Sequence, residues 1–179
     1  AGGASHLSAN LEKHPGGSEI WFDATDGVIS EVTISGNTIQ ATVQTGGANI
    51  RIVGADVERP QKADAPKTLK PDTAHLINIT GNVLGSQWRA VELRNVSRVT
   101  ITGNTIYDSA DLSVIATHSA GIVVSGNAFV WRGNDSEPAK DGLRFEDCDN
   151  VLLSSLATQR LCAGSAERGA AVTFVRCSD

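Results

Sequence analysis

Apolar and polar residues alternate along most of this chain in short runs, and the runs break at Gly-Asn pairs. An alternation with a period of two predicts β-strands, because successive side chains of a strand point to opposite faces. Gly-Asn predicts a sharp corner, since both residues tolerate a left-handed backbone. The pattern of strand, corner and strand recurs nearly unchanged in four segments: Val32–Gln40, Ile77–Ser86, Val99–Ser109 and Ile122–Trp131.

The spacing of these segments predicts a solenoid. The Asn of each pair serves as the reference position of the repeat. The steps between Asn37, Asn82, Asn104 and Asn127 are 45, 22 and 23 residues. Two weaker copies, Ile50–Val57 and Val151–Thr158, carry Ala55 and Leu156 at the Asn position and change the steps to 18, 27, 22, 23 and 29. A period in this range is typical of solenoid proteins, in which each coil buries its apolar side against the next coil.

A further strand precedes the repeated strand–corner–strand segment in each coil. Aligning Ala90–Asn104 with Gly142–Leu156 matches Val91 with Leu143, Leu93 with Phe145, Val96 with Cys148 and Val99 with Val151. Three strands per coil in a constant order predict an all-β fold, a parallel β-helix of about seven coils. Parallel crossovers are almost always right-handed, so we expect that hand. The Asn residues of the corners are then expected to be architectural and to form a hydrogen-bonded ladder.

The composition narrows the range of partners. Asp and Glu outnumber Lys and Arg by 20 to 15, which argues against a nucleic-acid partner. No apolar run is long enough to span a bilayer.

Cys148 and Cys177 occupy equivalent repeat positions and Cys162 lies in a loop-like stretch, and this odd number of thiols leaves the redox compartment open. The four His are isolated in the sequence, so we expect no metal site.

The chain is expected to form a single domain over residues 1–179. Residues 1–19 form an N-terminal segment or cap, and Trp21 is expected to be partly in the core or to cap the first coil. Two polar insertions, 58–72 and 131–142, break the rhythm and predict loops that wall a groove or simply cover the surface. Because the last segment ends between two strands, we expect a fragment of a longer solenoid or a second chain that caps the end.

The repeat resembles the right-handed parallel β-helix superfamily, which includes pectate lyases, polygalacturonases, alginate epimerases and phage tailspike depolymerases. The resemblance implies a polysaccharide partner, an extracellular or cell-surface location, and a substrate groove along the first strand of each coil. Alternation predicts which side chains of that strand face outward: Glu92, Arg94, Arg144 and Glu146. His118 and Asp147 follow just past the strand, and Trp88 precedes it, where its ring could stack on a sugar.

The resemblance also implies chemistry for these residues. Arg144, Glu146 and Glu92 are the candidate catalytic groups. In lyases of this type an Arg commonly acts as the base, and carboxylates of the active site hold Ca²⁺. Arg94, Trp88, His118 and Asp147 are the candidate substrate-binding residues. The alternative is that alternating Glu and Arg on exposed strands make ordinary cross-strand charge pairs.

Asp141 is a further catalytic candidate. The stretch DGLRFEDCDNVLLSS, which starts at Asp141, resembles a polygalacturonase segment in which this position is a catalytic Asp. Neither the Asp-Asp pair nor the Gly-His-Gly of that family follows, although an inverting hydrolase needs two carboxyl groups around a water.

Two hypotheses therefore stand for the function. The first is a lyase, hydrolase or epimerase acting on an acidic glycan. The second is a non-catalytic solenoid that serves as an adhesin, a stalk or a glycan-binding module. The fold alone does not choose between them.

Overall fold

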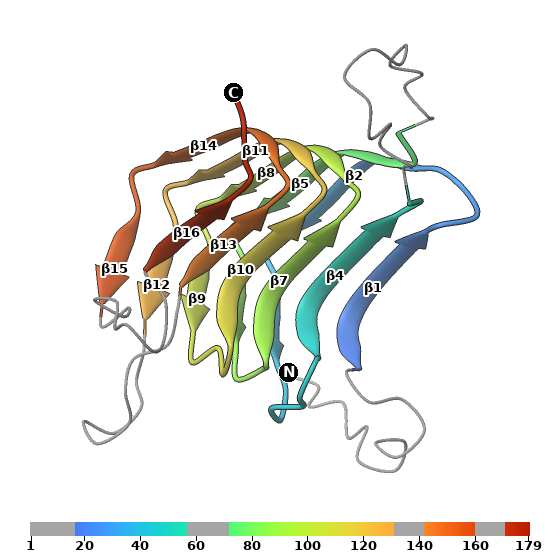
Figure 1. Cartoon of the computed structure of the whole chain (residues 1–179). Helices are drawn as coiled ribbons and strands as arrows, with labels where there is room; N and C mark the ends of the chain where they lie inside the picture. Colours follow the sequence, from blue (N-terminus) through green and yellow to red (C-terminus); the bar gives the residue numbers. More distant parts are fainter. Residues whose placement is uncertain (1–16, 57–71, 131–141, 160–170) are drawn as a thin grey trace.

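The chain forms a right-handed parallel β-helix (Figure 1). The structure, a computed structural model, describes residues 17–56, 72–130, 142–159 and 171–179. All the regular elements of these residues are strands, and they stack as three parallel sheets, with one strand of each sheet in a complete coil. The predicted fold class is confirmed. Within the described residues, no helix has the length and apolar character needed to cross a bilayer.

The first sheet carries the first strand of every coil. Its six strands lie in the order β1 (Ser18–Ala24), β4 (Ala48–Gly54), β7 (Arg89–Arg94), β10 (Leu112–Thr117), β13 (Leu143–Glu146) and β16 (Val172–Val175). We call the outer side of this sheet the first-strand face.

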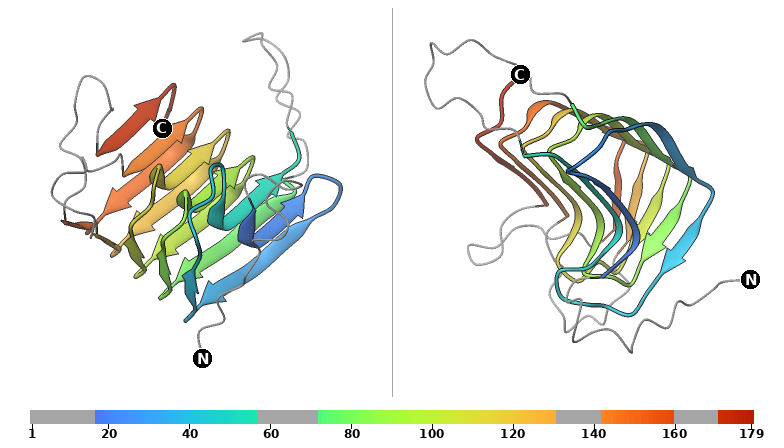
Figure 2. Two further views of the ribbon diagram at one scale, coloured as in Figure 1. Left: turned by 90° about the horizontal axis from the view of Figure 1, so that it is seen from below. Right: turned by 90° about the vertical axis from the view of Figure 1, so that its right-hand side faces the viewer.

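The other two sheets complete each coil. The second sheet contains β2 (Ile29–Ser35), β5 (Ala74–Thr80), β8 (Ser97–Thr102), β11 (Ala120–Ser125) and β14 (Asp149–Ser154). The third contains the short strands β3 (Thr38–Gln40), β6 (Val83–Gly85), β9 (Thr105–Tyr107), β12 (Ala128–Val130) and β15 (Ala157–Gln159). Figure 2 shows the coils superimposed along the stack, with the three sheets surrounding the interior.

The core consists of ladders of apolar side chains that run from coil to coil. Strand register places Leu93 against Ala116 and Ala116 against Phe145, and all three are fully buried. The second and third sheets contribute equivalent rows, such as Ile79 against Ile101. This packing explains the alternation in the sequence, because every inward residue meets its own equivalent about 4.8 Å away in the next coil.

The number of coils differs from the prediction of about seven. The described residues form five complete coils and the first strand of a sixth. The difference arises at Ile50–Val57, which was counted as a separate coil although it carries a first strand, β4, paired with β1 and β7. Asn37 donates from Nδ2 to Asn82 Oδ1 at 3.0 Å, so the 45-residue step between them is one long coil.

The predicted Asn ladder is confirmed. Nδ2 of Asn82 donates to Oδ1 of Asn104, and Nδ2 of Asn104 donates to Oδ1 of Asn127, both at 3.0 Å. Each of these buried amides also donates to a main-chain carbonyl, for example from Asn104 to Ile79 at 2.9 Å. The Gly before each Asn has a positive φ, as at Gly103 with 63°. The Gly-Asn corner therefore sets the turn and satisfies the buried backbone around it.

Some expectations concern residues outside the described ranges. Residues 58–71 and 131–141 of the two insertions lie there, as do Cys162 and Asp141. The first strand begins at Ser18, within the segment that was expected to be a cap. Trp21 therefore belongs to β1, and its side chain is 56% exposed, so the expectation of a core or capping role for this residue is wrong.

Candidate functional site

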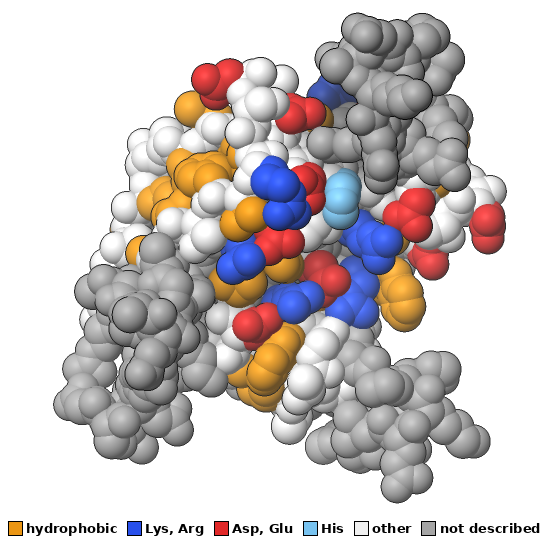
Figure 3. All heavy atoms as spheres, viewed as in Figure 1, with side chains coloured by type: hydrophobic (Ala, Val, Ile, Leu, Met, Phe, Trp, Pro, Cys, Tyr) orange, Lys and Arg blue, Asp and Glu red, His pale blue; other side chains and the backbone are white. Residues whose placement is uncertain are grey.

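The first-strand face presents two outward rows of side chains. Register gives the first row as Trp21, Arg51, Glu92, Ile115, Arg144 and Thr173. The second row is Asp23, Val53, Arg94, Thr117, Glu146 and Val175. The outward directions predicted for Glu92, Arg94, Arg144 and Glu146 are confirmed, and Ile115 lies between Glu92 and Arg144 in the first row. Figure 3 shows basic and acidic side chains gathered on this face.

Glu92 is the centre of an ion-pair network on β4 and β7. Its Oε2 accepts hydrogen bonds from Arg51 and Arg89, each at 3.0 Å, and Arg89 also donates to Asp111 at 2.9 Å. Burial opposes the charge on Arg89, but the bonds to Asp111 and Glu92 outweigh it and raise the pKa of Arg89. Arg51 in turn lies over the ring of Trp21, 5.5 Å from its centroid. Glu92 therefore serves as counter-ion to two guanidinium groups.

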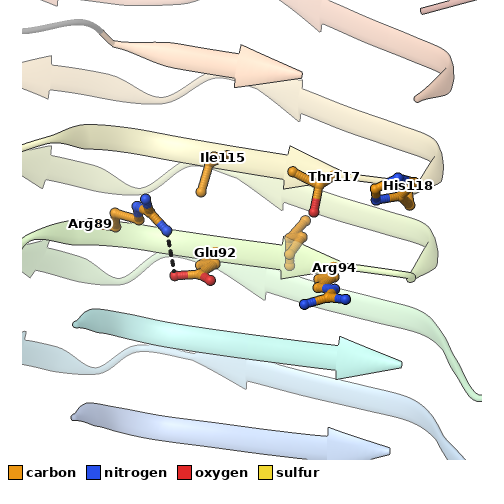
Figure 4. A pocket seen from close by; sticks show the side chains of 7 residues that line it. Arg89, Glu92, Arg94, Ile115, Thr117 and His118 are labelled. Atoms are coloured by element: carbon orange, nitrogen blue, oxygen red, sulfur yellow. Dashed lines mark hydrogen bonds and ion pairs between the residues drawn. The ribbon is translucent and has the colours of Figure 1, made fainter. Parts of the chain in front are cut away.

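A hollow of about 260 Å³ lies on this face between β7 and β10. It is lined by Arg89, Glu92, Leu93, Arg94, Ile115, Thr117 and His118. Figure 4 shows the Arg89–Glu92 pair at one end and Arg94 with His118 at the other. Ile115 lies opposite Glu92 on the neighbouring strand β10 and supplies an apolar surface. The hollow thus combines two guanidinium groups, one carboxylate, an imidazole and a hydroxyl around an apolar patch.

Two acidic residues border the hollow. Asp56 accepts hydrogen bonds from Asn95 at 2.7 Å and from Arg94 at 2.9 Å, and these two groups lower the pKa of Asp56. Asp147 lies 3.5 Å from the imidazole of His118 and accepts two hydrogen bonds of 2.7 Å from Arg176. The side chain of Arg94 remains 52% exposed. Arg94 and His118 are therefore about half exposed, and each lies beside a carboxylate.

The corner after the first strand has the same backbone geometry in successive coils. Asn95, His118, Asp147 and Arg176 all have positive φ, from 50° to 53°. A left-handed residue turns the chain sharply from the first sheet toward the second, and Asn and Asp adopt this conformation more readily than most residues. The four side chains consequently form one column beside the first-strand face.

The predicted catalytic residues do not converge. Glu146 pairs with Arg144 on its own strand, whereas Glu92 is held by Arg51 and Arg89. The two carboxylates lie two coils apart, about 10 Å along the stack, and two positions apart along the strand. Asp141 lies outside the described residues. The arrangement supports binding through charge more directly than acid–base work by a carboxylate pair.

The predicted binding residues divide into two groups. Arg94 and His118 line the hollow, and Asp147 supports His118 from the next coil. Trp88 lies in the turn before β7, is partly buried, and does not line the hollow.

Sequence reasoning missed several residues of this face. Arg51, Arg89 and Asp111 were not predicted as site residues, and Trp21 was predicted to lie in the core or to cap the first coil. The alternation in the segment Ile20–Ala24 carries the signal for Trp21, because Ile20 and Phe22 point inward and leave Trp21 outside. Arg51 follows from the same argument once Ala48–Gly54 is recognised as a first strand.

Among the described residues, no group of three or more His, Cys, Asp and Glu side chains is arranged to hold a metal ion. Comparison with protein families gives one informative match. The family model described as "Periplasmic copper-binding protein (NosD)" matches residues 17–164. Searches of curated proteins and of solved structures found no match.

Proposed function

Because the chain belongs to the NosD family of periplasmic copper-binding proteins, we propose that it acts outside the cytoplasm, as a β-helix that binds an acidic glycan on its first-strand face. The location follows from the description of the family. The observation that carries the ligand class is the hollow, whose lining holds Arg89, Arg94 and His118 beside one carboxylate, Glu92, and the apolar side chain of Ile115.

The residues of the hollow suit a sugar carboxylate. A guanidinium group offers parallel N–H donors that match the two oxygens of a carboxylate, and Arg94 is exposed enough to use them. The hydroxyl of Thr117 and the imidazole of His118 can form hydrogen bonds with the remaining polar groups of the sugar. Ile115 supplies a surface for the apolar face of the sugar ring.

Trp21 extends this surface along the stack. Its exposed ring lies in the same outward row as Glu92, two coils away, about 10 Å. Aromatic rings present a large flat apolar area on which a sugar ring can stack. A chain of several sugars could therefore contact both the hollow and Trp21, and no single residue would carry the whole affinity.

Cleavage of the bound glycan is the second candidate function. The observation in its favour is the half-exposed guanidinium group of Arg94 at the hollow, since an Arg serves as base in the lyases that the repeat resembles. Glu92 and Glu146 support this role less well, because each is engaged with Arg side chains.

Copper does not fit the first-strand face. A copper(II) site needs several nitrogen or oxygen ligands in a tetragonal arrangement. His118 lies 3.5 Å from the carboxylate of Asp147, but these two side chains belong to no group of three or more potential metal ligands among the described residues. His75 lies on the second sheet with Asp72 as neighbour. The family description also names copper rather than the calcium that the resemblance implied. The glycan proposal therefore involves no metal.

The test is a binding titration with polygalacturonate and alginate, with a neutral glycan for comparison. Arg94→Ala and His118→Ala should each weaken binding of the acidic polymers, Arg94→Ala by roughly tenfold or more, because a hydrogen bond to a charged group contributes about 1.5–3 kcal/mol. The matched control is Arg98→Ala. Arg98 is an exposed residue of β8 in the second sheet, and it pairs with Asp72.

Two outcomes would overturn the proposal. One is equal binding of acidic and neutral glycans. The other is an equal loss of affinity in Arg98→Ala and Arg94→Ala, which would indicate unspecific attraction to positive charge. The same samples, assayed for reducing ends and for unsaturated-uronate absorbance, test cleavage. Product that is absent in Arg94→Ala would support the lyase candidate.

A further inference from the structure

Two cysteines lie one above the other in the interior of the helix. Phe145 pairs with Phe174 and Asp149 bridges to Ser178, so Cys148 and Cys177 occupy the same position in successive coils. Cys148 is fully buried, and Cys177 is partly buried. We call these two residues the dithiol pair. Neither belongs to the hollow, and the proposed glycan function does not use them.

The two sulfur atoms have the same orientation. Sγ of Cys148 donates to the carbonyl of Glu146, two residues earlier, at 3.2 Å, and to Ala116 in the preceding coil at 3.4 Å. Sγ of Cys177 donates to the corresponding carbonyls, Val175 at 3.5 Å and Phe145 at 3.4 Å. Because the two sets of bonds correspond, the sulfurs are related by one step of the stack, about 4.8 Å.

This spacing suits a bridging atom better than a direct S–S bond. A disulfide brings the two Cβ atoms to about 3.5–4.5 Å, closer than side chains stacked in register at the spacing of strands. Two thiolates that bind one metal ion from opposite sides lie farther apart. With a metal–sulfur bond of about 2.3 Å, as measured for zinc, the sulfurs would be about 4.6 Å apart, close to the spacing of the coils.

The geometry points to a copper(I) site, and we propose that the thiolates of Cys148 and Cys177 together bind one Cu⁺ ion. Thiolates are soft ligands that select copper(I), whereas a structural zinc site takes four ligands. Each thiol releases its proton when the ion binds, and the copper keeps its oxidation state. The partly buried Cys177 gives the ion a route to the fully buried Cys148.

The inference concerns the chain's own residues and extends the family description. That description states that the family binds copper, and it assigns no residue. Among the described residues, the dithiol pair places two soft ligands in successive coils. A site built on the pair would also join two coils through the metal, and it would stabilise the folded state by an amount that grows with the logarithm of the free ion concentration once that exceeds Kd.

The first experiment measures copper(I) binding to the reduced full chain without oxygen, in competition with a chromogenic copper(I) chelator. The wild type should withdraw one ion per chain from the chelator. Cys148→Ser and Cys177→Ser should each weaken binding by more than about 100-fold, since the loss of even an outer-shell partner of a metal ligand costs about 10–100-fold. The control is Cys162→Ser, which removes the remaining cysteine of the chain and should bind like the wild type.

The second experiment needs no variant and so does not depend on how a substitution folds. X-ray absorption of the copper(I)-loaded wild type should show two sulfur neighbours. Nitrogen or oxygen neighbours in place of sulfur would overturn the proposal. So would wild-type affinity in both Cys148→Ser and Cys177→Ser, or a reduced wild type that binds no copper(I).

Discussion

Replacement of Asn104 by Ala tests the contribution of the Asn ladder to stability. The side chain of Asn104 makes four hydrogen bonds in a buried position. Its Oδ1 accepts from the main-chain N–H of Asn82 at 2.9 Å and from the Asn82 amide at 3.0 Å. Its Nδ2 donates to Ile79 and to Asn127. Alanine removes all four bonds without changing the register of the strands.

The expected loss can be worked out bond by bond. A buried N–H left without its acceptor, here that of Asn82, costs about 1–3 kcal/mol. The three other bonds contribute about 0.5–1 kcal/mol each, because their partner groups keep some of their other contacts. The free energy of unfolding should therefore fall by roughly 2.5–6 kcal/mol. This value is a large fraction of the total stability of a typical domain.

The assay is equilibrium unfolding in guanidinium chloride, followed by far-ultraviolet circular dichroism. The matched control is Asn37→Ala at the exposed end of the same ladder, where Nδ2 donates to Ser35 and to Asn82. We expect this control to lose less than about 1 kcal/mol, because exposed amides exchange their partners for water. Equal losses in the two variants would refute the reasoning that burial makes the ladder stabilising.

Two further changes test the core and the first coil. Phe145→Ala removes a fully buried ring that stacks on Phe174 at 5.3 Å, and it should lower the free energy of unfolding by about 3–5 kcal/mol, measured by denaturation. Phe174→Ala, at a ring that is 51% exposed, should cost clearly less, and the reverse order would contradict the packing. Burial raises the pKa of Glu19 above 4.5, against the hydrogen bonds from Asn49 and Gln87. The protonated carboxyl is thus favoured in the folded state, so the stability that Glu19 contributes is present below its unfolded pKa and is lost as the pH rises through the folded value. As the pH rises from acidic to neutral, Glu19→Gln should therefore become more stable relative to the wild type, as measured by thermal unfolding. A difference in stability between the two proteins that stays constant across this pH range would contradict the prediction.

The repeat allowed much of the fold to be predicted from the sequence. The alternation of apolar residues fixes which side chains point inward, and a period of 22 or 23 residues relates equivalent positions in the regular coils. The predictions that Cys148 is equivalent to Val96, and that Glu92 and Arg144 both face outward, needed only this period and the alternation. These assignments hold in the structure because parallel strands in register preserve the sequence alignment in space.

The errors arose where two kinds of strand look alike. First and second strands of a coil share the same alternation, so Ile50–Val57 was read as a second strand with its own coil. Only pairing across the stack distinguishes them, and the insertion that follows hid the regular period. The ion pair of Glu92 with Arg51 was missed for a related reason, since these two residues are 41 apart in the sequence.

The stack of three sheets has a mechanical consequence. Its main-chain hydrogen bonds run along the axis of the helix on three sides, so bending in any direction must stretch one row of bonds and compress another. The molecule should behave as a stiff rod in which the distance from Trp21 to the hollow hardly varies. A ligand that spans several coils would then meet a surface of fixed length, and only the ligand would lose conformational freedom on binding.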